Sequence, residues 1–221
     1  MKKSGIYLPV SLVIALFFSI PLSATSWATP DSIPSKAESL KDLSELKVKA
    51  KSYNPIYKRS AFGEPWADID KNGCDTRNDI LQRDLFQQVT SFEKGPCIII
   101  SGKLLDPYTN KTINFTRGST TSILVQIDHV VSLSNAWQTG AYQLSDSKRA
   151  ELANDPQNLI ATSGKVNQIK SDKDAASWSP QNKSFHCSYA ALTITVKKKY
   201  KLWVTKSEKL ALSKMLISCN P

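Results

Sequence analysis

A strand-like segment that carries both a carboxylate and an imidazole constrains this chain most. Residues Ile123–Val131 are apolar and β-branched around this pair, a pattern typical of a strand that enters a hairpin. Asp128 and His129 stand side by side in it, and His129 is one of only 2 histidines in the chain. An isolated Asp-His pair more often makes a structural hydrogen bond than a catalytic site, so its interpretation depends on the residues that accompany it.

Two asparagines give the pair a chemical context. Leu159–Thr162 predicts a short strand directly after Asn158, and residues 165–171 predict a helical turn that carries Asn167. Carboxylate and amide oxygens are hard ligands that suit Mg²⁺ or Mn²⁺ better than Zn²⁺. A neutral imidazole can take a proton from water. Asn158 follows Asp-Pro-Gln, where ordinary turn chemistry is the alternative interpretation.

This strand, strand and helix unit resembles the HNH, or ββα-metal, nucleases in a variant with Asp-His, Asn and Asn. The resemblance implies that Asp128 and Asn167 bind one divalent cation, Mg²⁺ or Mn²⁺. It implies that His129 is the general base and that Asn158 holds the histidine and its loop in place. The implied activity is metal-dependent hydrolysis of phosphodiester bonds in DNA, with RNA as a second substrate.

A longer set of motifs is similar to secreted bacterial HNH-family proteins and covers about Tyr53 to Cys219. Within this range, Lys170 and Arg83 are the candidates for neutralising a phosphate. The motifs that carry the longer resemblance are Phe62-Gly63, Trp66, Asn72-Gly73-Cys74-Asp75-Thr76-Arg77, Asp106-Pro107-Tyr108-Thr109 and Leu202-Trp203-Val204-Thr205.

The amino-terminal segment predicts export. Lys2 and Lys3 precede a mostly apolar run, Leu8–Leu22, and Ser26 and Ala28 provide the small residues of a cleavage site. We therefore expect a signal peptide over residues 1–28 and a secreted or cell-envelope protein without stable membrane association. An uncleaved anchor is the alternative, although the run is shorter than the roughly 20 residues of a spanning helix.

The remainder is expected to be one α+β domain. Residues 29–52 are predicted to be a mobile leader in which Ala37–Lys51 has some helical character, and the nuclease domain is predicted to cover 53–221. Further helices are expected over Asp75–Leu85, Leu133–Tyr142, Asp146–Ala153, Tyr189–Tyr200 and Lys206–Ser218, and further strands over Cys97–Ser101 and Thr112–Thr116.

All 4 cysteines follow the predicted signal peptide, and an even number in an exported chain indicates two disulfides. Three pairings are open. We favour Cys74–Cys97 with Cys187–Cys219, because each closes a local loop. A zinc site is the competing interpretation, but the chain lacks the paired Cys-x-x-Cys that is typical of one.

The chain is basic, with 29 Lys and Arg against 19 Asp and Glu. Such a surface attracts nucleic acid, but also anionic cell walls and membranes, so charge alone does not select a partner. The rivals to a monomeric nuclease are an exported nucleic-acid-binding protein without catalysis and a cell-wall hydrolase, which would need a second carboxylate near Asp128. The segment Asp68–Asp79 resembles a calcium loop, with a turn and helix cap as the alternative.

Overall fold

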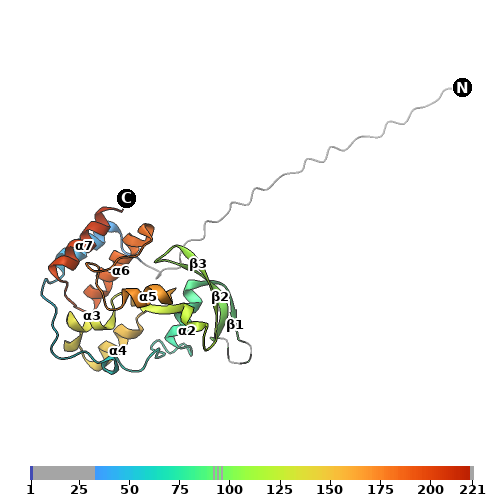
Figure 1. Ribbon diagram of the computed structural model, residues 1–221, viewed down its shortest axis with the longest axis horizontal. Coiled ribbons are helices and arrows are strands. Elements are labelled where there is room, and N and C mark those ends of the chain that lie inside the picture. The colour runs from blue at the N-terminus through green and yellow to red at the C-terminus, as the bar shows by residue number, and fades with distance from the viewer. Residues whose placement is uncertain (2–32, 92, 94, 96, 220–221) are drawn as a thin grey trace.

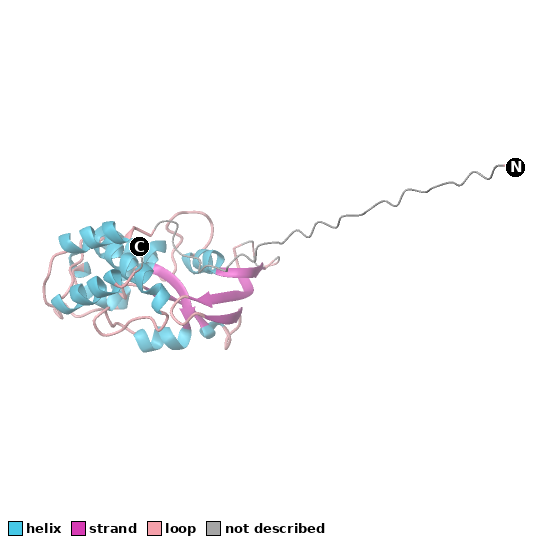
Figure 2. Cartoon of the chain, turned by 90° about the horizontal axis from the view of Figure 1, so that it is seen from above, coloured by secondary structure: helices cyan, strands magenta, loops and turns pink. Residues whose placement is uncertain are grey.

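The computed structural model describes residue 1 and residues 33–219 apart from 92, 94 and 96. The predicted signal peptide lies outside the described residues except for Met1. Most of the helices gather at one end of the molecule, and a three-stranded sheet lies at the other end with one helix, Thr76–Asp84, packed beside it (Figure 1, Figure 2). This is an α+β arrangement, as predicted. Within the described part of the chain, no helix is long and apolar enough to cross a membrane.

The elements follow the predicted order closely. The helices are α1 (Lys36–Glu45), α2 (Thr76–Asp84), α3 (Leu133–Gln138), α4 (Asp146–Asn154), α5 (Gly164–Lys170), α6 (His186–Lys199) and α7 (Lys206–Ile217). The strands are β1 (Leu85–Thr90), β2 (Ile99–Asp106), β3 (Lys111–Thr116), β4 (Val125–His129) and β5 (Leu159–Ser163). Strand β1 was not predicted, because it follows α2 without a turn residue between them.

Two antiparallel sheets organise the strands. One has the order β1-β2-β3, and the other pairs β4 with β5. In the second sheet Asp128 lies opposite Ile160 and His129 opposite Leu159. Helix α5 follows β5 directly and contacts both strands of this pair. The Asp-His strand is therefore followed in the fold by a returning strand and a helix that packs on both.

Strand β4 and the residues after it lie where three apolar clusters meet. Ile127 belongs to a cluster formed with α2 and the three-stranded sheet. Val130 belongs to a cluster with α1, α6 and α7, and Val131 to one with α3 and α4. A segment buried against three clusters has little freedom to move. The backbone that carries Asp128 and His129 is therefore well anchored.

The prediction of a mobile leader is wrong for residues 33–52, because this segment is folded onto the domain. Ser35 caps α1 through a capping box with Glu38, which satisfies the first amides of the helix. Leu43 and Leu46 pack into the same cluster as α6 and α7. After the helix, Lys49 donates its backbone N–H to the carbonyl of Val204 at 3.0 Å. The leucine spacing makes this segment amphipathic, so it is part of the folded domain.

Both predicted disulfides are confirmed. Cys74 pairs with Cys97 and Cys187 pairs with Cys219, and the described chain holds no free cysteine. The first bond ties the start of α2 to the start of β2, and the second ties the start of α6 to the end of α7.

Candidate functional site

His129 is the last residue of β4, and its ring is held in one orientation. The side chain is 9% exposed, and its Nε2 lies 2.8 Å from the carbonyl oxygen of Ala153. A carbonyl can only accept, so Nε2 carries the proton and the lone pair of the neutral ring is on Nδ1. The indole of Trp66 stacks on the imidazole at 6.3 Å between centroids. Nδ1 is therefore the atom that can act as a base.

The imidazole of His129 is kept neutral. Burial lowers the pKa of His129 to about 3, and the hydrogen bond to Ala153 only partly opposes this shift. The positive charges of Arg59 and Lys170 lower the pKa further. Arg59 is exposed, so a guanidinium close enough to influence the histidine faces solvent. Sequence reasoning missed both Arg59 and Trp66 as neighbours of His129, because neither is near it along the chain.

Asp128 points to the other face of β4, where two buried side chains hold it. Tyr108 donates its hydroxyl to Oδ2 at 2.7 Å. The ammonium of Lys170 lies 3.1 Å from Oδ1 and 3.0 Å from Oδ2, and it also donates to the carbonyl of His129. Lys170 is 0% exposed and Asp128 4% exposed. Burial raises the pKa of Asp128, while Lys170 and Tyr108 act in the opposite direction.

The Asp106-Pro107-Tyr108 motif brings the tyrosine to Asp128. Asp106 is fully buried at the end of β2 and accepts from the backbone N–H of Tyr108 at 3.2 Å. It also accepts from the hydroxyl of Thr109 at 2.5 Å and from that of Thr162 on β5 at 2.6 Å. The motif therefore joins the two sheets as well as forming the turn that the sequence predicted. The resemblance included these residues, but it assigned them no role.

Asn158 fixes the chain that follows His129. It is 0% exposed, and its Oδ1 accepts from the backbone N–H of Val131 at 2.8 Å. Its amide group donates to the carbonyls of Val131 and Leu152, each at 3.3 Å. These contacts tie Asn158 to the chain just after His129, and its role in positioning the histidine stays a prediction.

Asn167 lies on α5 over the same face of β4 as Asp128. Its Nδ2 donates to Oε1 of Gln126 at 2.9 Å. Gln126 and Asp128 are two residues apart in a strand and so share a face. The structure thus places the two predicted metal ligands on one side of β4 and the predicted base on the other. No side-chain hydrogen bond links His129 to Asp128 or Asn167 among the described residues.

A hard divalent cation fits the donor types of this site, but Asp128 already has a partner for each oxygen. Asp128 and Asn167 offer a carboxylate and an amide oxygen, which suit Mg²⁺ or Mn²⁺. The ammonium of Lys170 and the hydroxyl of Tyr108 occupy the carboxylate. Within the described ranges, no group of three or more His, Cys, Asp or Glu is placed to hold an ion. A cation bound here would have to share Asp128 with Lys170.

The predicted phosphate ligands are both engaged elsewhere. Arg83 pairs with Asp84 at 2.6 Å and donates to the carbonyls of Pro156 and Leu159. Lys170 is buried against Asp128, as described above. Each cation thus compensates a buried carboxylate, and a phosphate bound there would have to share it.

The calcium-like segment forms a hydrogen-bonded turn before α2. Asp68 accepts from the backbone of Asn72 and Gly73, and the Asn72 amide donates to Asp70 and Asp79. Burial and the neighbouring carboxylates raise the pKa of Asp79. These contacts match the turn that was the alternative interpretation.

Comparison with known proteins gives the family. A family model described as GmrSD restriction endonucleases, C-terminal domain, matches residues 75–215, which include every site residue named above except Arg59, Trp66 and the 68–73 turn. An uncharacterized secreted protein of Arthroderma benhamiae (strain ATCC MYA-4681 / CBS 112371) is 39% identical over 193 residues, 86% of this chain and 89% of the relative. No solved structure matches. The chain belongs to the family of the GmrSD restriction endonuclease C-terminal domain, a nuclease-type family.

Proposed function

We propose that this protein is an exported, metal-dependent endonuclease of the HNH type that hydrolyses phosphodiester bonds of DNA, with RNA as a second substrate. One observation carries the proposal. In a chain of a nuclease-type family, His129 ends β4 as a neutral imidazole whose Nε2–H is bonded to Ala153, which leaves the Nδ1 lone pair for a water molecule.

The residues around His129 support its role as the base. Proton transfer from water to Nδ1 creates an imidazolium, and the Ala153 carbonyl that accepts from Nε2 stabilises that positive charge. A pKa of about 3 makes the ring a weak base before substrate binds. A phosphodiester beside the ring adds a negative charge, which favours the protonated form and raises this pKa.

The proposed cation would be held by Asp128 and Asn167. A bound Mg²⁺ or Mn²⁺ supplies stabilisation for the negative charge that develops on phosphate oxygens during hydrolysis. Lys170 and Tyr108 orient the Asp128 carboxylate, and Gln126 orients the amide of Asn167. Arg59 is an exposed cation whose charge lowers the pKa of His129.

Export is part of the proposal. The Arthroderma benhamiae relative is described as secreted, and the two disulfides of this chain suit an oxidising compartment.

Nicking of supercoiled plasmid tests the function. The oxidised protein is assayed with Mg²⁺, Mn²⁺ or EDTA, beside His129→Ala and His186→Ala. His186 is a matched control, because its Nε2 also lies 2.8 Å from a backbone carbonyl, that of Pro180. We expect metal-dependent nicking that is lost only in His129→Ala. Equal activity of the two variants, or nicking that persists in EDTA, would contradict the proposal.

The buried Asp128–Lys170 pair favours one alternative, an exported nucleic-acid-binding protein without catalysis. A carboxylate already compensated by an ammonium at 3.0 Å has no need of a second cation. This alternative predicts DNA binding that survives EDTA in wild type and in His129→Ala, with no cleavage under any metal.

A further inference from the structure

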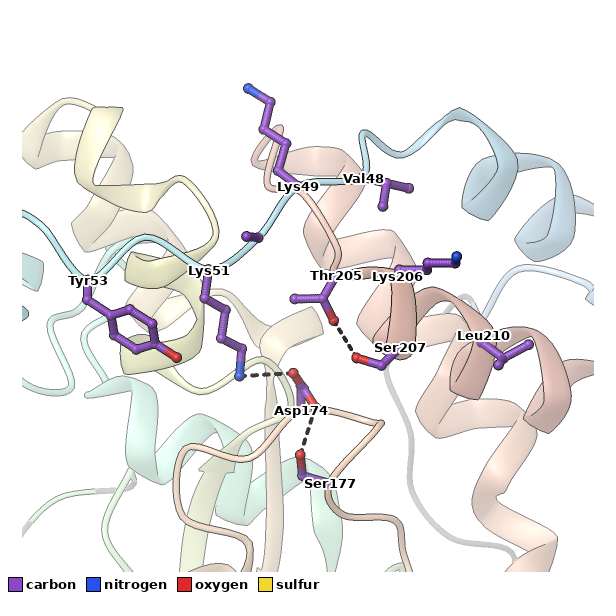
Figure 3. A pocket seen from close by; sticks show the side chains of 11 residues that line it. Val48, Lys49, Lys51, Tyr53, Asp174, Ser177, Thr205, Lys206, Ser207 and Leu210 are labelled. Carbon is purple, nitrogen blue, oxygen red and sulfur yellow. Dashed lines mark hydrogen bonds and ion pairs between the residues drawn. The ribbon is translucent and has the colours of Figure 1, made fainter.

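A wide cleft lies beside α7, and none of the residues assigned to the proposed catalytic site lines it. It has a volume of ≈ 990 Å³ and is bordered by the segment Val48–Tyr53, the start of α7 and the segment Asp174–Ser177. Figure 3 shows the side chains of Lys51 and Tyr53 extending from the first segment toward Asp174. The volume is at the upper end of ordinary ligand pockets, roughly 300–1,000 Å³, so a single phosphate would not fill it.

The charges around the cleft favour an anionic occupant. Lys51 is compensated, because its ammonium lies 2.9 Å from the carboxylate of Asp174. Lys49 and Lys206 extend away from this pair, as Figure 3 shows, and both are exposed. Neither forms an ion pair within the part of the chain that the structure describes. The rim therefore presents two positive charges that lack a carboxylate partner among the described residues, and the ammonium of Lys49 lies 5.2 Å from the centroid of the Trp203 ring.

The walls of the cleft add exposed apolar and aromatic surface. Tyr53 is 70% exposed, Leu210 57% and Val48 49%, which are high values for side chains of this kind. Exposed apolar side chains beside uncompensated lysines match a surface that contacts both bases and phosphates. A duplex keeps its bases stacked inside, whereas a single strand offers base faces to an aromatic ring.

Both walls of the cleft continue into the catalytic region. The segment that carries Tyr53 runs on to Arg59 and Trp66, which lie close to His129. On the other side, Asp174 follows shortly after Lys170, which binds Asp128. A strand lying in the cleft would thus be held by segments that also border the proposed site.

We propose that this cleft binds a single strand of nucleic acid, with phosphates beside Lys49 and Lys206 and a base against Tyr53. The inference rests on the proposed nuclease function and extends it, since it gives the enzyme a second binding surface outside the catalytic site. Substrates with single-stranded flanks or gaps are then bound more tightly than continuous duplex.

Fluorescence anisotropy with a labelled 20-nucleotide single strand tests the cleft directly. Binding is measured in EDTA over a range of NaCl concentrations for wild type, Lys49→Gln/Lys206→Gln and Tyr53→Ala. The matched control is Lys103→Gln/Lys111→Gln, which removes two exposed lysines from β2 and β3 at the other end of the molecule. Circular dichroism verifies that each variant is folded.

Loss of the phosphate contacts and loss of the base stacked on Tyr53 should change the binding of the single strand in different ways. Each phosphate contact contributes a slope of about 0.7 to log K against log salt for a single strand. Losing two contacts lowers the slope by about 1.4, which is roughly 25-fold weaker binding at 0.1 M salt. Loss of one base stack in Tyr53→Ala weakens binding about 5- to 150-fold without changing the slope.

Other results would contradict the proposal that this cleft binds a single strand. An equal loss in the Lys103/Lys111 control would show that only net charge matters. A Lys49/Lys206 variant that loses binding to anionic lipid vesicles but keeps its affinity for the single strand would assign the surface to membranes. Hydrolysis of bis(p-nitrophenyl) phosphate with Mn²⁺ separates the two proposals, because this small substrate does not need the cleft. Its hydrolysis should be unchanged in the cleft variants, and its absence from every variant would refute the nuclease function alone.

Discussion

Lowering the pH from 7.5 to 5 should destabilise the fold by about 2 kcal/mol through His129 alone. In the unfolded chain the histidine has a pKa near 6.5, whereas burial holds the pKa in the folded protein at about 3. The unfolded state therefore takes up a proton as the pH falls through 6.5, and the folded state does not. Stability is lost progressively below pH 6.5, by about 2 kcal/mol at pH 5 and about 4.4 kcal/mol at pH 3. The value at pH 5 does not depend on the exact folded pKa, provided that it is below about 4.

Urea unfolding at several pH values measures this contribution. The comparison is wild type against His129→Gln, whose amide can still donate to the Ala153 carbonyl but does not titrate in this range. Subtracting the two curves cancels what the other titrating groups contribute. The buried carboxylates Asp84 and Asp128, for example, have raised pKa values and so act with the opposite sign.

The histidine resonances in NMR spectra provide a second, direct measurement. The ring protons of His129, assigned by comparison with His129→Gln, should not shift with pH between 7.5 and 5 in the folded protein. Two results would refute the reasoning: a His129 titration near pH 6.5, or stability curves of wild type and His129→Gln that run parallel over this range. Either would mean that the ring is open to water and not buried against Ala153 and Trp66.

Three further changes test the interactions that hold the site. Lys170→Met should cost about 3–5 kcal/mol, because it leaves the buried charge of Asp128 without a compensating cation. Adding Asp128→Asn should recover most of this loss in urea unfolding, and no recovery would mean that Lys170 acts by packing alone. Tyr108→Phe should cost about 1.5–3 kcal/mol in the same assay, as expected for a hydrogen bond to a charged group, and no loss would contradict the contact. Replacing Cys187 and its partner by serine should cost roughly 3–4 kcal/mol from loop entropy, seen as a lower Tm than that of the oxidised wild type.

The strand pair that carries Asp128 and His129, the place of Asn158 and the two disulfides could all be predicted from the sequence. The two strands of the Asp-His unit are antiparallel, and Asn158 immediately precedes the second of them. Residues 130–158 separate these two strands, so the place predicted for Asn158 followed from the resemblance to the HNH nucleases and not from a short connection. Local spacing did give the two disulfides, each of which closes a local loop.

The partners of Asp128 could not be predicted, because they come from distant segments. Tyr108 lies 20 residues before Asp128 and Lys170 lies 42 residues after it. Lysine is rarely buried fully, so a sequence gives no reason to remove it from the surface. Lys170 was accordingly expected to face a phosphate, and only the packing of α5 on β4 shows that it faces a carboxylate.

The leader was misjudged for a different reason. Its charge and proline content are typical of a disordered segment, and α1 alone is too short to be stable in water. Its stability comes from burying Leu43 against α6 and α7, which lie at the far end of the chain. The composition indicated the helix, but it did not indicate that the helix packs on segments so distant in sequence.

The charges around Asp128 should make binding of the proposed metal depend on binding of the nucleic acid. One carboxylate is already matched by the ammonium of Lys170 in a site where both side chains are almost fully buried. A divalent cation added there alone would leave two uncompensated positive charges away from water, which is strongly unfavourable. A phosphodiester that arrives with the cation supplies a negative charge at the same place. We therefore expect the metal to bind weakly to the free protein and tightly together with nucleic acid, so that the Asp128–Lys170 pair makes metal loading depend on the presence of substrate.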